Sequence, residues 1–354
     1  MKINRRKTRI VSIGGRAIGG ENPILIQSMT NTDTRDAEAT AAQINALSAV
    51  GCEIARVAVP DEAAAYALSA IKTKINIPLV ADIHFDYRLA LKAIENGVDK
   101  LRINPGNIGD INKVREVVSA AKDRGIPIRI GVNAGSLEKR LLDKYQGPTA
   151  QGMVESAEGH IQILQDLGFE DIVVSMKASN VLLTIDAYSL FSEKYDYPLH
   201  LGVTEAGVLR SAAVKTGVGL GYLLLNGIGD TLRVSVTGDP LEEIYVAKDL
   251  LSSMGLFKQK DGMVEVVSCP TCGRTEIDLI GIAQEMNNRL QNVHKDLKVA
   301  VMGCVVNGPG EGKEADIGVA GGKGKGVLFK KGQVFKTVAE DEIIPALMEE
   351  IEKM

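Results

Sequence analysis

The chain has 354 residues, a length that fits two domains or one large one. With 45% hydrophobic residues, 24% charged residues and four cysteines, its composition is that of a globular protein and excludes disorder, a collagen-like chain and a disulfide scaffold. The net charge of −4 and the aromatic content of 4% argue against non-specific DNA binding and against stacking platforms for single-stranded nucleic acid.

The N-terminal segment does not have the pattern of a secretory signal. Residues 1–9 are basic, but only the short apolar stretch 10–13 follows before two glycines. The longest apolar run elsewhere, residues 299–306, is far shorter than a membrane-spanning helix. We therefore expect a cytoplasmic protein whose cysteines are reduced thiols.

The first 240 residues repeat one unit, a short β-rich run followed by a stretch with helical periodicity. The predicted strands are residues 24–28, 53–59, 79–83, 100–103, 128–132, 172–175, 199–203 and 231–236. Their starts are about 30 residues apart on average, the size of one βα unit. Several of the intervening helical stretches end in a glycine, as at Gly51 and Gly97, which is a common helix stop. Eight such units predict a (β/α)8 TIM barrel.

A doubly wound sheet is the alternative fold. Its first βα turn would carry G-x-G-x-x-G, and residues 29–35 do not. The G-x-G-x-G run at 217–221 resembles a nucleotide loop, but it follows a predicted helix (208–218) rather than a strand, so the pattern disfavours that function.

The barrel is expected to end with a helix at 241–254, so that residues 1–254 form the first domain. A polar linker, 255–262, leads to a second domain at 263–354. In this α+β domain we predict strands at 263–267, 297–302, 317–320, 326–329 and 333–337, a helix between the first two strands, and a final helix at 341–350.

Ionisable residues interrupt the predicted barrel strands or follow directly after them. They are Arg56, Asp82, His84, Arg102, Arg129, Lys177, Glu205 and Arg233. Because the C-terminal ends of barrel strands face the active site, these side chains are expected to converge on one mouth. Five cations in one place repel one another unless an anion lies among them, and the planar fork of arginine suits phosphate. The alternative is that each charge pairs with a neighbouring carboxylate, but few acids share the same strand ends.

The row of cations therefore predicts a small, highly anionic ligand such as a diphosphate. Asn104, Asn133 and Ser235 lie close by in sequence and add neutral hydrogen-bond donors. Glu205, in the segment LHLGVTEAG, is the candidate acid or base, because an anion-binding mouth needs few carboxylates. His84 is either a second titrating group or only a hydrogen-bond donor.

Three of the four cysteines lie in the second predicted domain, with the spacing C-x2-C-x31-C at Cys269, Cys272 and Cys304. The pair CPTC is typical of a redox dithiol, of half a zinc site or of part of an iron–sulfur cluster. No thioredoxin-like βαβ pattern surrounds the pair. A structural zinc ion needs four good ligands, and His294 is the only histidine nearby.

An iron–sulfur cluster normally takes four thiolates. The remaining cysteine, Cys52, opens an apolar barrel strand and is expected in the core. Glu311, in the glycine-rich segment after Cys304, is either a fourth ligand that a substrate oxygen displaces or a solvated turn residue. Spacing alone does not choose between these two interpretations.

Four motifs resemble one known family across essentially the whole chain. QSMTNTDTRD, HLGVTEAG, CPTCGR and MGCVVNGPGE occur in the order found in the 4-hydroxy-3-methylbut-2-enyl diphosphate synthase family, in its two-domain bacterial form. The resemblance implies a (β/α)8 barrel followed by a small cluster domain. It implies that Cys269, Cys272, Cys304 and Glu311 ligate a [4Fe-4S] cluster. It places Arg56, Arg102, Arg129, Asn133, Lys177, Arg233 and Ser235 around the substrate's diphosphate, and Asp82, His84, Thr204 and Glu205 at the barrel mouth.

The implied reaction is a two-electron reductive ring opening and dehydroxylation of 2-C-methyl-D-erythritol 2,4-cyclodiphosphate. Glu205 would help the hydroxyl leave as water, and flavodoxin or ferredoxin would supply electrons. The resemblance also implies a head-to-tail homodimer that pairs each barrel with its partner's cluster domain. Two alternatives stay open from the residues alone: a barrel enzyme, pterin- or sugar-phosphate-directed, with a zinc-bound accessory domain, and an electron-transfer or scaffold protein whose cluster is only a relay.

Overall fold

The computed structural model describes residues 3–257, 262, 264–291, 293, 295–305, 310 and 312–354. The chain divides into two compact units, Met1–Phe257 and Lys258–Met354. The division falls within the segment predicted as a linker, of which residues 258–261 lie outside the described part. None of the described helices is long and apolar enough to cross a membrane.

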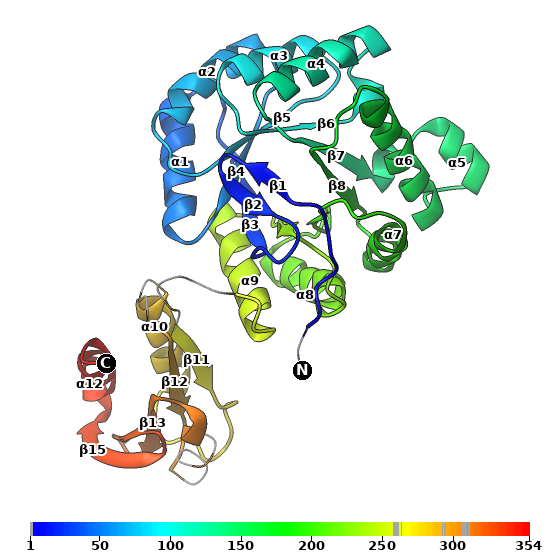
Figure 1. Cartoon of the computed structure of the whole chain (residues 1–354). Helices are drawn as coiled ribbons and strands as arrows, with labels where there is room; N and C mark the ends of the chain where they lie inside the picture. The colour runs from blue at the N-terminus through cyan, green and yellow to red at the C-terminus, as the bar shows by residue number, and fades with distance from the viewer. Residues whose placement is uncertain are drawn as a thin grey trace. The chain divides into compact units, whose positions relative to one another are not determined.

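Eight parallel strands form the barrel of the first unit (Figure 1). They are β3 (Leu25–Met29), β4 (Ile54–Ala58), β5 (Leu79–Asp82), β6 (Lys100–Ile103), β7 (Ile128–Asn133), β8 (Ile172–Lys177), β9 (His200–Leu201) and β10 (Thr231–Leu232). The strand order is β8-β7-β6-β5-β4-β3-β10-β9, and a parallel bridge between Val174 and Leu199 nearly closes the ring. The predicted TIM barrel is confirmed, and the doubly wound alternative is wrong.

Helices cover the outside of the barrel. They are α1 (Ala37–Ala49), α2 (Glu62–Lys72), α3 (Tyr87–Glu95), α4 (Ile111–Asp123), α5 (Lys139–Tyr145), α6 (Ala150–Asp166), α7 (Val181–Lys194), α8 (Leu209–Leu225) and α9 (Pro240–Ser253), with short 3-10 turns η1 (Pro105–Asn107) and η2 (Ala134–Ser136). Aspartate side chains start several of them: Asp36 accepts the backbone N–H of Ala39, and Asp61 accepts that of Ala64. The G-x-G-x-G run lies inside α8, so it is not a nucleotide loop.

A hairpin that the sequence analysis did not predict closes the N-terminal end of the barrel. It consists of the antiparallel strands β1 (Val11–Ile13) and β2 (Arg16–Ile18). Its buried side chains form an apolar cluster with Leu25, Ile54, Val80 and Val173, which lie at the starts of barrel strands. The opposite, C-terminal end is therefore the end at which a ligand can enter, as is usual for this fold.

The main core fills the space between the strands and the surrounding helices. Cys52 is 2% exposed within this core, which confirms its prediction as a core residue. Burial raises the pKa of its thiol to about 12, so the side chain behaves as a small apolar group.

The second unit has one five-stranded sheet in the order β11-β12-β13-β14-β15. The strands are β11 (Val264–Ser268), β12 (Leu297–Met302), β13 (Ile317–Gly322), β14 (Lys325–Lys330) and β15 (Gln333–Ala339). The first three are parallel and the last two pairings are antiparallel. Helices α10 (Leu279–Leu290) and α12 (Ile343–Glu352) pack their apolar side chains against this sheet, and the 3-10 turns η3 (Gly312–Glu314) and η4 (Glu340–Glu342) lie between elements.

Candidate functional site

A cavity of about 150 Å³ lies where the barrel strands end, and polar side chains make up its wall. It is lined by Arg56, Asp82, His84, Arg102, Arg129, Asn133, Ser175, Lys177, Thr204, Arg233 and Ser235. The strand ends of a barrel converge, so residues that are far apart in sequence meet here. All the barrel residues predicted for the site lie in this wall except Asn104 and Glu205.

Asn104 and Glu205 lie outside the cavity lining. The Asn104 side chain is engaged with β7: its Nδ2 donates to the carbonyl of Gly131 at 2.9 Å, and its Oδ1 accepts the Gly131 N–H at 2.8 Å. This asparagine therefore holds the end of β6 against β7. Glu205 is exposed, on the loop after β9, and has a left-handed backbone with φ of 52°. Its neighbour Thr204 does reach the cavity.

Asp82 is the carboxylate at the centre of the cationic wall. Its carboxylate accepts a hydrogen bond from Arg102 Nη1 at 3.1 Å and lies 3.8 Å from Arg56 Nε and 3.4 Å from His84 Nε2. Burial of Asp82 opposes its ionisation, but the hydrogen bond from His84 and the charges of the nearby arginines hold its pKa well below the usual range. Burial lowers the pKa of the Arg56 guanidinium to about 10. Asp82 is therefore an anion that organises the cations around it.

A second carboxylate, Glu243, binds Arg233 and is not itself part of the cavity lining. Glu243 is 2% exposed on the first turn of α9, and its two oxygens accept from Arg233 Nε at 3.0 Å and from Nη2 at 2.8 Å. It also accepts from the Ser28 hydroxyl at 2.7 Å and from the backbone N–H of Val236 at 3.3 Å. A bidentate pair of this kind fixes the plane of the guanidinium. Sequence analysis missed this residue, because acidic residues are ordinary in the first turn of a helix.

Arg129 has buried N–H groups without a partner. Its Nη1 donates to Ser175 Oγ at 2.8 Å, but Nε and Nη2 are buried and have no hydrogen bond to the described residues. Buried donors are almost always satisfied, so these two indicate an acceptor that binds in the cavity. Ser175 was also missed. The signal for it is a polar residue two positions before Lys177 in an otherwise apolar strand, since alternate residues share one face of a strand.

Two glycines make room for these cations in the barrel wall. A Cβ on Gly131 would lie 2.5 Å from Arg102 Nε, and a Cβ on Gly202 would lie 2.5 Å from Lys177 Nζ. Such distances are far inside van der Waals contact. A side chain at either position would displace the charged group that lies over the glycine.

The cavity has more cations than the described carboxylates can pair. Asp82 pairs with Arg56 and Arg102, and Glu243 pairs with Arg233. Arg129 and Lys177 form no ion pair with a described residue. The alternative of one carboxylate per cation is thus wrong for these two, and the cavity is suited to a small ligand with more than one negative charge.

The predicted thiol ligands follow two adjacent parallel strands of the second unit. Ser268 pairs with Val301 between β11 and β12, so Cys269 and Cys304 both come just after the ends of neighbouring strands. The backbone N–H of Gly303 donates to Cys269 Sγ at 3.2 Å. Hydrogen bonds involving Arg274 lower the pKa of the exposed Cys272 thiol. These donors have the chemistry of thiolate metal ligands.

Part of the predicted cluster site lies outside the described residues. Glu311, residues 306–309 and His294 are not among them. The described His, Cys, Asp and Glu side chains form no group of three that is close enough to hold a metal ion. The ligand assignment for Cys269, Cys272, Cys304 and Glu311 therefore stays a prediction.

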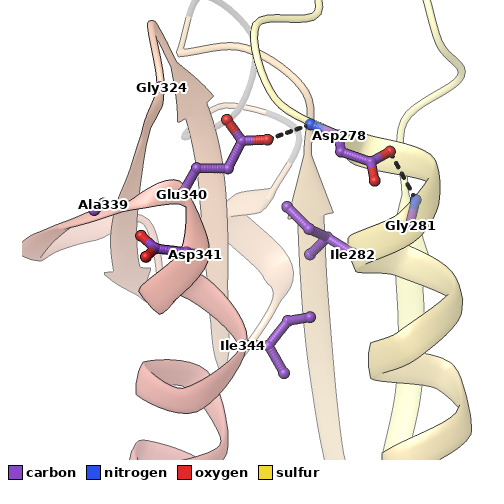
Figure 2. Close-up of a pocket in the computed structure, with 8 residues that line it drawn as sticks. All are labelled: Asp278, Gly281, Ile282, Gly324, Ala339, Glu340, Asp341 and Ile344. Carbon is purple, nitrogen blue, oxygen red and sulfur yellow. Dashed lines mark hydrogen bonds between the residues drawn. The ribbon is translucent and has the colours of Figure 1, made fainter.

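A larger hollow, of about 680 Å³, lies on the second unit near α10 and η4 (Figure 2). Two of its carboxylates serve local structure: Asp278 accepts the Gly281 N–H at 3.0 Å and caps α10, and Glu340 accepts the Asp278 N–H at 2.7 Å. The hollow is lined by neither a cysteine nor any other residue predicted for the site. We assign it no function.

Comparison with known proteins agrees with this organisation. Residues 8–248 match the model of the GcpE TIM-barrel domain, and residues 265–353 match that of the GcpE protein C-terminal domain. A protein of Caldanaerobacter subterraneus subsp. tengcongensis named 4-hydroxy-3-methylbut-2-en-1-yl diphosphate synthase (flavodoxin) is 61% identical, over 99% of this chain and 98% of its own. A protein of the same name from Bacillus velezensis is 59% identical, over 99% of this chain and 93% of its own.

Among solved structures, the dihydropteroate synthase of Xanthomonas albilineans in complex with 7,8-dihydropteroate is similar, with a TM-score of 0.50 and 13% identity. The match covers 70% of this chain and 97% of that one. At such low identity the likeness concerns the fold alone. The family models cover nearly the whole chain, and the two relatives named above share more than half of its residues. The chain therefore belongs to the GcpE family of 4-hydroxy-3-methylbut-2-en-1-yl diphosphate synthases.

Proposed function

We propose that the cavity at the barrel mouth binds the diphosphate of 2-C-methyl-D-erythritol 2,4-cyclodiphosphate. As a member of its family, the chain is an oxidoreductase that converts this compound to 4-hydroxy-3-methylbut-2-enyl diphosphate in isoprenoid biosynthesis. The observation that carries the proposal is the buried Arg129, whose Nε and Nη2 have no partner among the described residues. A phosphate oxygen is the acceptor that suits a guanidinium fork.

The other lining residues divide between charge and hydrogen bonding. Arg56, Arg102 and Arg233 are held in place by carboxylates, so their free N–H groups are already oriented before a ligand arrives. Ser175 and Ser235 add neutral donors. Such preorganised donors stabilise the charge that the opening ring places on its oxygens and fix the reacting carbons. The proposed acid, Glu205, would act from the rim beside Thr204.

We also propose that Cys269, Cys272, Cys304 and Glu311 hold a [4Fe-4S] cluster. The synthases of this family are iron–sulfur enzymes as a class. The positions of Cys269 and Cys304 after neighbouring strands, and the thiolate-favouring surroundings of Cys272, support the assignment. When bound, the cluster supplies the two electrons of the reduction one at a time. Flavodoxin is the proposed electron donor, because the relatives carry it in their names.

A homodimer is the proposed assembly, and a cytoplasmic location the proposed compartment. The outer face of α8 supports the dimer. Val214, Val218, Tyr222 and Leu225 are 62%, 56%, 52% and 45% exposed on it, and the inner face of the same helix is apolar as well. Residues 216–225 of α8 have no charged side chain, and a helix segment that is apolar on several sides is normally covered, so a second copy of the chain is the proposed cover. A head-to-tail arrangement would bring each barrel to its partner's cluster domain.

The test is anaerobic purification followed by iron and sulfide analysis and turnover of the cyclic diphosphate with a chemical reductant. We expect about four irons per chain and turnover that Arg129→Met abolishes. Arg115→Met, on the exposed face of α4, is the matched control and retains activity. An intact cluster without turnover would defeat the enzymatic assignment. A colourless, zinc-containing preparation would defeat the cluster, and full turnover by Glu205→Gln would remove that residue from the mechanism.

A further inference from the structure

Lys177 is a buried cation that lacks a carboxylate. It is 7% exposed at the end of β8, where it lines the cavity, and it forms no ion pair with the described residues. Its Nζ has one hydrogen-bonding neighbour in the described structure, Nε2 of His200, at 3.5 Å. An ammonium ion in such surroundings has lost its water without gaining an anion, which is costly.

The neighbour, His200, does not supply a negative charge. It is fully buried, and its Nδ1 lies 2.8 Å from the Thr231 hydroxyl, which fixes the ring. Burial, together with the charges of Arg129 and Lys177, lowers the pKa of His200 well below its ordinary value. A neutral imidazole at this position accepts a hydrogen bond from Lys177 or donates one to its amine, depending on the tautomer.

The charged groups that act on Lys177 are cations, with one exception on α9. They are Arg56 on β4, Arg129 on β7, Arg233 on β10 and Glu243 on α9, and Glu243 is already paired with Arg233. The neutral His200 on β9 adds no charge, and Lys100 on β6 acts on His200. Asp82, His84 and Arg102 line the same cavity, where Asp82 is paired with Arg56 and Arg102. Burial and the three arginines lower the pKa of Lys177 well below its ordinary value. Guanidinium groups keep their protons in proteins, whereas a buried ammonium readily gives one up. Of the five cations in the cavity wall, Lys177 is thus the one that can relieve the repulsion.

We propose that binding of a diphosphate in this cavity is coupled to uptake of one proton by Lys177. The amine is neutral in the free enzyme, and its Nζ lone pair takes a proton from solvent when the anion enters. The anion replaces the missing carboxylate and makes the ammonium form the stable one. The inference rests on the proposed function of the cavity. It adds that the negative charge of the ligand is the counter-charge that Lys177 lacks.

A second buried lysine provides the internal comparison. Lys100 is also fully buried, with a lowered pKa, but its Nζ contacts Gln27 Oε1 at 3.3 Å and it is not among the cavity-lining residues. An anion in the cavity therefore meets Lys177 directly and Lys100 only through the barrel interior. Both lysines are buried, but only Lys177 lines the cavity that the ligand would enter.

The experiment is isothermal titration calorimetry of the holoenzyme with sodium sulfate and with inorganic pyrophosphate, in buffers of different ionisation enthalpy at one pH. Sulfate does not titrate near neutrality, so protons taken up with it enter the protein. We expect uptake approaching one proton in the wild type, loss of that uptake in Lys177→Met, and its retention in Lys100→Met. In the wild type the Kd for sulfate should rise by up to about tenfold per pH unit while the free lysine is neutral and the bound lysine charged.

Anion binding without proton uptake would overturn the inference and leave the proposed function standing. Equal uptake in the wild type and in Lys177→Met would also overturn it. If Lys177→Met does not fold, the pH dependence of sulfate binding by the wild type decides: a Kd independent of pH contradicts the inference. If neither anion binds, the proposed diphosphate site itself fails, a result that the turnover assay reports separately.

Discussion

Replacing Glu243 by glutamine should destabilise the barrel strongly, although the residue is not part of the cavity lining. The carboxylate is 2% exposed and accepts four hydrogen bonds, two from Arg233 and one each from Ser28 and Val236. Glutamine keeps the volume, but it puts an amide donor against donors and leaves Arg233 without its counter-charge. Removing one partner of a buried ion pair costs about 3–5 kcal/mol.

The lower end of that range applies here, because the Arg233 side chain is 18% exposed and water can partly solvate it. A loss of about 3 kcal/mol corresponds to a fall of about 6–12 °C in Tm for a unit of this size. Thermal unfolding followed by circular dichroism measures it. Glu242→Gln is the matched control on the same helix turn, and its effect should stay within about 0.5 kcal/mol.

Equal Tm values for Glu243→Gln and Glu242→Gln would refute the reasoning. A further readout separates charge from packing. Pyrophosphate at about 100 times its Kd stabilises a folded protein by about 2.7 kcal/mol. Because the anion replaces the lost carboxylate beside Arg233, its stabilising effect at one fixed concentration should be larger in Glu243→Gln than in the wild type. A variant that is merely badly packed would show no such difference.

Three more predictions concern the cavity and the outer surface. Gly131→Ala places a Cβ against Arg102 and should weaken pyrophosphate binding about tenfold, which is roughly the contribution of one charge-assisted hydrogen bond. Gly135→Ala is the control, because a Cβ there meets open space, and it should bind pyrophosphate normally in the same titration. The pKa of Asp82 is lowered in the folded state, so its charge stabilises the fold at neutral pH, and this contribution is lost progressively as the pH falls below about 4. In urea unfolding, the stability advantage of the wild type over Asp82→Asn should therefore shrink in acid. An advantage that is unchanged at pH 3 would contradict this prediction. Val218→Asp should shift the protein from dimer to monomer in analytical ultracentrifugation, and a dimer that persists would exclude this face of α8 as the interface.

The barrel could be predicted from sequence because each βα unit carries its own local signals. Apolar runs marked the eight strands, and terminal glycines marked the ends of several helices. The predicted strands at 199–203 and 231–236 are longer than β9 and β10, which pair only over His200–Leu201 and Thr231–Leu232. Thr204, Arg233 and Ser235, which follow these short strands, line the cavity. The β1–β2 hairpin escaped prediction because strands of three residues carry too short a pattern.

The row of cations was also visible in the sequence, since charge is rare inside barrel strands. Whether each charge has a partner was not visible. Glu243 meets Ser28 across 215 positions of the chain, and Ser175 meets Arg129 across 46, so local periodicity contains no sign of either contact. Asn104 and Glu205 follow predicted strands and were therefore expected to line the cavity. In the structure, however, the Asn104 side chain hydrogen-bonds the backbone of Gly131, and Glu205 is exposed on its loop.

The sequence by itself determined the class of fold, the kind of ligand and the thiol spacing, because these depend on residue type and on neighbours along the chain. Only the tertiary structure decided which cations are paired and which are left for the ligand, because ion pairing depends on distances between segments that folding brings together. Asp82 and Glu243 hold three arginines, and Arg129 and Lys177 stay without a carboxylate in the described structure. Pairing sets the energy of a buried charge, since a counter-charge a few ångströms away offsets the loss of water around it.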